Sequence, residues 1–116
     1  MNMISVSLNG TLHWQHIRVA STFFQRLVGL LNTPVLTSDG GLLLTGCNNV
    51  HTIGMRYPID LVFLDQHQRV TSVAHTLAPC RFCVDKSAAM VLELCSGQVA
   101  QSDMTVGDTL HFGATQ

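Results

Sequence analysis

"PIDLVFLD", residues 58–65, is the stretch that decides the fold. Its apolar side chains fall on both faces of an extended chain, and Pro58 and Asp65 bound the run. It therefore predicts a central β-strand from Ile59 to Leu64 that is covered on both sides. The preceding residues, 47–55, are mostly weak helix formers, and Pro58 disfavours helical geometry just ahead of it. We expect an irregular approach to the strand there and not a helix.

Further strands are expected on either side of this one. A hairpin turning at Asn9-Gly10 is expected over residues 4–19, because this dipeptide favours the two-residue turn of antiparallel strands. Four other segments have the apolar content of strands, with "AMVLELC" apolar on both faces. They are "GLLLTG" (41–46), "RVTSVAH" (69–75), "AMVLELC" (89–95) and "GDTLHF" (107–112).

One clear helix is expected over residues 22–31. Thr22 and Gln25 have the spacing of a capping box at its start, and Asn32 and Pro34 are expected to end it. A short helical turn is expected near residues 97–102. Many closely spaced strands with one true helix predict a mainly β fold, an antiparallel sandwich or barrel-like single domain of residues 1–116.

The composition excludes some classes of function. Only six of the 116 residues are Lys or Arg, and they are scattered, so no basic surface for nucleic acid is expected. The sequence contains no run of 18 apolar residues, the length needed to span a membrane, and no secretory signal is visible at its start. These features predict a cytoplasmic location and reduced thiols. With 11% charged residues and a net charge of −1, little repulsion keeps copies apart, which favours a protein partner or self-association.

Four segments carry a resemblance to a known family. "RLVGLLN" (26–32), "HTIGMRYPIDLVFLD" (51–65), "VLELCSGQV" (91–99) and "VGDTLHF" (106–112) occur in this order. Together they resemble the bacterial and archaeal domain-of-unknown-function family 192, over roughly residues 15 to 112. The resemblance implies a mainly β sandwich or barrel with short helices. It implies no activity, because the family's biochemical role is not established.

Two carboxylates stand among apolar residues. Glu93 lies inside "MVLELC" and Asp60 near the start of the central strand. A buried carboxylate needs partners, or its pKa rises. The available partners are Arg26, Arg56 and His51, and with the two carboxylates they form a candidate polar cluster. A buried ion-pair network is favoured over a ligand or catalytic site, and no catalytic residue is assigned.

The soft ligands of the sequence suggest two metal sites, neither of them favoured. Cys47, His51 and Met55 recur every four residues and would suit copper. Cys47 and His51, joined by Cys80 and Cys83 of "PCRFC", would complete a tetrahedral zinc set. Cysteine is more often a small buried hydrophobe, so no metal and no cofactor is expected.

The sequence alone favours a non-enzymatic binding or accessory module. One alternative is a hydrolase-type enzyme that uses Asp60, Glu93 and His51 as acid and base groups. Another is a protein stabilised by zinc through Cys47, His51, Cys80 and Cys83. A pocket around the polar side chains would favour the enzyme, and a closed polar cluster beneath an apolar surface would favour the module.

Overall fold

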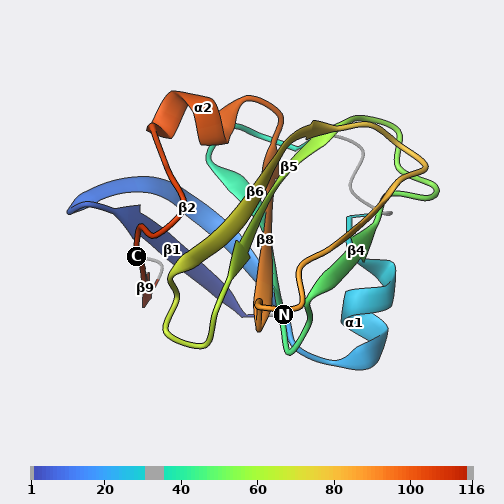
Figure 1. Ribbon diagram of the computed structural model, residues 1–116, viewed down its shortest axis with the longest axis horizontal. Coiled ribbons are helices and arrows are strands. Elements are labelled where there is room, and N and C mark those ends of the chain that lie inside the picture. Colours follow the sequence, from blue (N-terminus) through green and yellow to red (C-terminus); the bar gives the residue numbers. More distant parts are fainter. Residues whose placement is uncertain (1, 31–35, 115–116) are drawn as a thin grey trace.

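The computed structural model describes residues 2–30 and 36–114. Along these residues, strands follow one another with two short helices between them (Figure 1). The elements are β1 (Met3–Leu8), β2 (Thr11–Ala20), α1 (Phe23–Val28), β3 (Gly40–Thr45), β4 (Asn49–His51), β5 (Ile59–Leu64), β6 (Val70–Leu77), β7 (Phe82–Val84), β8 (Met90–Cys95), α2 (Gln98–Ser102) and β9 (Leu110–Ala114). The predicted mainly β class is confirmed.

Seven strands form one mixed sheet in the order β6-β5-β8-β3-β2-β1-β9. Neighbouring strands of this sheet are antiparallel, as expected for most pairs, except β2 and β3, which pair in parallel. The sheet curls strongly, and its two edges approach each other where Arg69 bridges Thr109 and the Val70 N–H donates to the Asp108 carbonyl at 2.8 Å. The sheet curls towards a barrel without closing into one.

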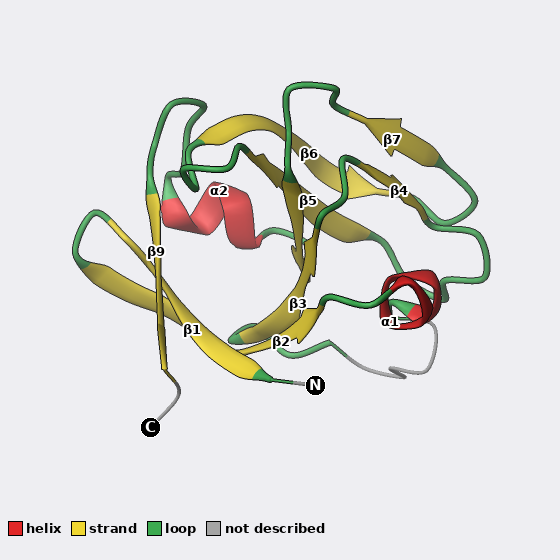
Figure 2. Cartoon of the chain, turned by 90° about the horizontal axis from the view of Figure 1, so that it is seen from below, coloured by secondary structure: helices red, strands yellow, loops and turns green. Residues whose placement is uncertain are grey.

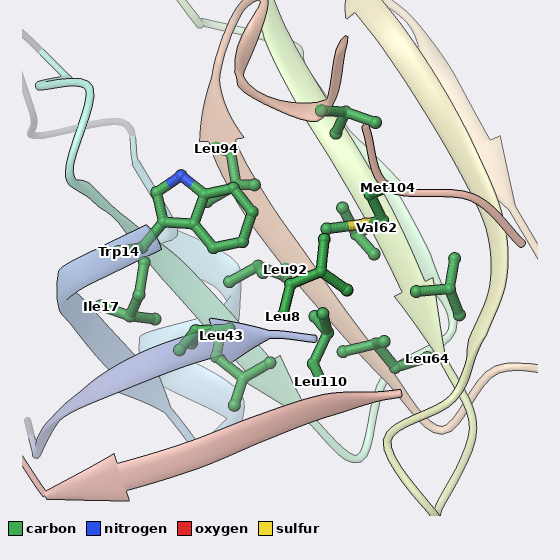
Figure 3. Close-up of a cluster of buried hydrophobic side chains, with 13 residues drawn as sticks. Leu8, Trp14, Ile17, Leu43, Val62, Leu64, Leu92, Leu94, Met104 and Leu110 are labelled. Atoms are coloured by element: carbon green, nitrogen blue, oxygen red, sulfur yellow. The ribbon is translucent and has the colours of Figure 1, made fainter. Parts of the chain in front are cut away.

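The central strands are apolar on both faces because both faces of the sheet are covered. On the inner face, which the curl encloses, Trp14 packs with residues of α2 and β9, and Figure 3 shows this core. The outer face is covered by α1 and by a two-stranded ribbon of β4 and β7 (Figure 2). The outer core contains Ala20, Leu30, Leu42, Leu44, Val50, Ile59, Leu61, Phe63 and Val91.

The predicted local signals are found with small changes in their bounds. Asn9 and Gly10 have φ of 51° and 80° and join β1 to β2, as the hairpin prediction requires. The capping box of Thr22 and Gln25 is present, but α1 ends at Val28, earlier than expected. The predicted stop at Asn32 and Pro34 lies outside the described residues. The helical turn near 97–102 is α2, and neither described helix is long and apolar enough to cross a membrane.

The stretch before β5 is not helical, as predicted, but it contains a strand that the sequence did not indicate. β4 pairs antiparallel with β7, so that Val50 lies opposite Cys83 and His51 opposite Phe82. The ribbon packs Val50 into the outer core and leaves Phe82 77% exposed. It forms one wall of the site described next.

Candidate ligand pocket

Glu93 lies in the middle of the outer face of the sheet. Its partner on β3 is Leu42 and its partner on β5 is Leu61, and both belong to the outer core. Leu42 in turn lies opposite Arg18 of β2. Because paired residues of neighbouring strands share a face, Arg18 and Glu93 lie on the same side of the sheet, with β3 between their strands.

The environment of Glu93 disfavours its charge. The residue is 5% exposed, and burial raises the pKa of its carboxyl from 4.5 to about 8, with the charge of Arg18 acting in the opposite direction. Tyr57 lies close by: burial raises the pKa of its hydroxyl, and the charge of Glu93 raises it further. At neutral pH Glu93 is therefore mostly protonated and can donate a hydrogen bond as well as accept one.

A cavity of about 570 Å³ opens between α1, the β4 strand and the outer face of the sheet. Glu93 lines it from the sheet, Arg26 from α1 and His51 from β4. Its apolar walls include Leu44, Val50, Met55 and other small or aliphatic residues. The volume lies in the range of small-molecule sites.

Arg26 is fixed at one end of this pocket. Its Nη1 donates to the carbonyl of Ser21 at 2.9 Å and to the carbonyl of Thr45 at 3.1 Å. Thr45 is the last residue of β3 and lies opposite Met90, three residues before Glu93 on β8. At about 3.3 Å per residue, roughly 10 Å of strand separates the Arg26 end from the Glu93 end.

Asp60, the other candidate carboxylate, lies on the opposite face. It pairs with Leu94 of the inner core, and it is fully buried. Its oxygens accept backbone N–H groups from Thr76 at 2.7 Å and from Gly97 and Val99 at 3.0 Å each. Asp60 therefore fastens the end of β6 and the start of α2 to the sheet.

These positions correct the predicted polar cluster. The structure brings Arg26, His51 and Glu93 to one pocket. Asp60 is satisfied by backbone donors on the other face, and not by the cations expected for it. Arg56 is exposed and does not line the pocket. Asp60 and Glu93 therefore cannot act together as an acid–base pair.

No sequence pattern singled out Arg18, whose charge acts on the Glu93 carboxyl, or Tyr57, whose hydroxyl the charge of Glu93 affects. Arg18 reaches this position through the parallel pairing of β2 with β3, which no local pattern indicates. The sequence indicates the position of Tyr57 only weakly, through its place beside Pro58 just before the central strand.

The zinc set considered as an alternative is not assembled among the described residues. Within the described residues, no group of three or more His, Cys, Asp or Glu side chains is arranged to hold a metal ion. Cys47 donates its thiol to the carbonyl of Asn49 at 3.0 Å and packs against the outer core, as does Cys83. Burial, followed by the charge of Asp85, raises the pKa of the Cys83 thiol. Of the copper trio, Cys47, His51 and Met55 all line the pocket, where Met55 and Cys47 pack against the outer core.

The fold and the site define a small mainly β protein with a curled mixed sheet and a polar-floored pocket on its outer face. The chain belongs to the DUF192 family, described as "Uncharacterized ACR", whose family model matches residues 4–112.

Individual relatives agree with this assignment. A UPF0127 protein of Thermococcus sibiricus is 28% identical over 115 residues, which cover 95% of this chain and 74% of that protein. A protein of unknown function from Novosphingobium aromaticivorans has the same fold, with a TM-score of 0.82, 19% identity, and coverage of 94% of this chain and 83% of that one. A Sinorhizobium meliloti protein described as a candidate transcription regulator has a TM-score of 0.84, 20% identity, and coverage of 97% and 96%. Family and neighbours leave the function unassigned.

Proposed function

We propose that this chain is a small, non-enzymatic binding module that takes an organic small molecule in the pocket on its outer face. The observation that carries the proposal is the cavity of about 570 Å³ with the buried carboxyl of Glu93 in its lining. Mostly apolar walls with a few convergent polar groups are the usual composition of a ligand site. Polar side chains of the lining here are Glu93, Arg26, His51, Asn48 and Asn49.

A buried carboxyl in a pocket is costly to stability, which supports a role in binding. Burying an ionisable group costs free energy, and groups whose pKa is strongly perturbed gather at functional sites. Asp60 differs from Glu93 in this respect. Three backbone N–H groups satisfy its carboxylate, and it does not line the pocket.

Two-dimensional amide NMR of the protein, recorded before and after mixtures of common organic metabolites are added, tests the proposal. We expect one mixture to shift the amide signals of residues 46–51 and of Ala88, Ala89 and Glu93, which line the pocket. Ala88→Phe should fill the pocket and abolish these shifts. Ala100→Phe is the matched control, because Ala100 is exposed on α2 and does not line the pocket. Shifts that survive Ala88→Phe, or that cluster elsewhere, would contradict the proposal.

A second candidate function is a hydrolase-type enzyme, since Glu93 and His51 line the same pocket. With Asp60 on the other face, Glu93 would be the acid and His51 the base. Activated esters and amides offered as substrates test it. Turnover that Glu93→Gln and His51→Ala both remove would favour the enzyme over the binding module.

We propose a cytoplasmic location as well. It is supported by the four free cysteines, since thiols stay reduced in that compartment. Fractionation of the native host, with detection of the chain in the cytosolic fraction, is the direct test.

A further inference from the structure

The pocket has two polar ends of different chemistry, roughly 10 Å apart along the strands. One end holds the guanidinium of Arg26, anchored on the carbonyls of Ser21 and Thr45. The other end holds the carboxyl of Glu93, buried in the sheet. A ligand that meets both ends has to be elongated.

The wall between these ends is apolar. Leu44 lies between Thr45 and Leu42 on β3 and is 4% exposed, and Val50 of β4 is 6% exposed. Ile59, Met55 and Ala88 add further hydrocarbon surface to the lining. An aliphatic segment of a ligand would bury apolar surface against these side chains, which favours binding.

The charge of the pocket is positive. Among its described lining residues, Arg26 is the one that stays charged at every pH of interest, and Glu93 is the one carboxyl. Because burial raises the pKa of Glu93 to about 8, that carboxyl contributes little negative charge at neutral pH. Arg18, on the same face as Glu93, adds a second positive charge nearby.

Arg26 is suited to bind an anion. Within the described part of the chain the Arg26 side chain donates from Nη1 alone, and a guanidinium carries five N–H donors in a planar fork. Two of the remaining donors can meet both oxygens of a carboxylate, which is the geometry that arginine favours. The two backbone carbonyls hold the fork in place before any ligand arrives.

We propose that the pocket binds an elongated aliphatic carboxylate, with its anionic end on Arg26 and an uncharged hydrogen-bonding group, such as a hydroxyl, on Glu93. This inference rests on the proposed binding function and names the ligand class for the same site. A straight chain of about eight carbons spans the distance between the two ends. The protonated Glu93 carboxyl can donate a hydrogen bond to the hydroxyl oxygen and can accept one from the hydroxyl O–H.

Calorimetric titration of the whole chain with three matched probes tests the inference. The probes are 8-hydroxyoctanoate, octanoate, which lacks the far hydroxyl, and 1,8-octanediol, which lacks the anion. We expect 8-hydroxyoctanoate to bind at least about tenfold more tightly than the diol, because a charge-assisted hydrogen-bond pair contributes a factor of this size. It should bind more tightly than octanoate by a smaller factor. Equal or tighter binding of the diol, or no binding of either carboxylate, would overturn the inference.

Substitution of Arg26 tests which end of the pocket meets the anion. Arg26→Met should weaken 8-hydroxyoctanoate at least about tenfold while leaving the diol unchanged, since only the anion meets the guanidinium. Arg56→Met is the matched control, because Arg56 is exposed and outside the pocket. If Arg26→Met lowers the melting temperature too far for titration, Arg26→Lys keeps the charge without the fork and should still reduce the preference for carboxylate over diol. An unchanged preference would overturn the assignment.

The two proposals fail in different ways. If metabolite mixtures shift the pocket amides and Ala88→Phe abolishes the shifts, but carboxylates show no preference, the binding module stands and the ligand class is wrong. If the pocket amides respond to nothing, both are wrong.

Discussion

Replacing Glu93 by Gln should remove a large part of the pH dependence of the stability of this fold. Gln keeps the size and the hydrogen-bonding ability of a protonated Glu but cannot ionise. Glu93 is 5% exposed on the outer face of the sheet, among Leu42 and Leu61, so its ionised form is poorly solvated. The variant therefore isolates the cost of that one negative charge.

The size of the effect follows from the two pKa values. The carboxyl titrates at about 8 in the folded chain and near 4.5 in the unfolded chain. Because the pKa is higher in the folded chain, the contribution of Glu93 to the free energy of unfolding is fully present below about pH 4.5. It is lost as the pH rises towards about 8. At about 1.4 kcal/mol per unit, the whole shift corresponds to about 5 kcal/mol. Of this, about 2 to 3 kcal/mol is lost between pH 5 and 7, and about 1 kcal/mol more by pH 9.

Urea denaturation of the wild type and of Glu93→Gln at pH 5, 7 and 9 measures this. Contributions of all other titrating groups cancel in the difference between the two proteins, so the gap should widen with pH in favour of Gln. Asp103→Asn is the matched control, because Asp103 is exposed at the end of α2 and its left-handed backbone tolerates Asn. A constant gap from pH 5 to 9 would show that Glu93 titrates as a solvated carboxyl, and the description of the pocket floor would be wrong.

Three other outcomes are expected. Asp60→Asn should destabilise by about 3 kcal/mol in chemical denaturation, since an amide offers one acceptor oxygen to the three backbone donors of Asp60; a loss below about 1 kcal/mol would contradict its anchoring role. Trp14→Phe should cost about 1 to 3 kcal/mol in thermal or urea unfolding, because it empties core volume and leaves Gln98 without the indole N–H that donates to it at 3.0 Å; an unchanged midpoint would count against this packing. In the folded, reduced protein Cys80 should react with a thiol reagent well before Cys83, because Cys80 is exposed and burial raises the pKa of Cys83; mass spectrometry of the labelled sites decides the order, and faster labelling of Cys83 would refute it.

The parts of the fold predicted from the sequence are those fixed by local chemistry. The Asn9-Gly10 turn, the capping box of Thr22 and the run from Ile59 to Leu64 each act over a few residues and were found where expected. The ribbon of β4 and β7 was missed because strands of three residues carry too short an alternation to read. The parallel pairing of β2 with β3 depends on a long connection through α1, which no local pattern specifies.

The candidate site was only half predictable, and strand register is the reason. Alternation along each strand correctly separates the faces of β5 and of β8. Whether Asp60 and Glu93 share a face, however, depends on how the two strands align. The observed register places Asp60 opposite Leu94 and Leu61 opposite Glu93, so the two carboxylates point in opposite directions. A shift by one residue would have brought them together, and side-chain chemistry alone does not reveal the shift.

The pairing of β1 with β9 sets the order in which this protein can be completed during synthesis. Of the described strands, β1 leaves the ribosome first, yet one of its two partners is β9, which leaves it after all the others, with Ile4 opposite Ala114 and Leu8 opposite Leu110. Until β9 emerges, the hairpin of β1 and β2 offers an open edge, and the inner core lacks Leu110. A nascent chain stalled before β9 should therefore be a natural client of chaperones, and truncation there should favour aggregation over a smaller folded form.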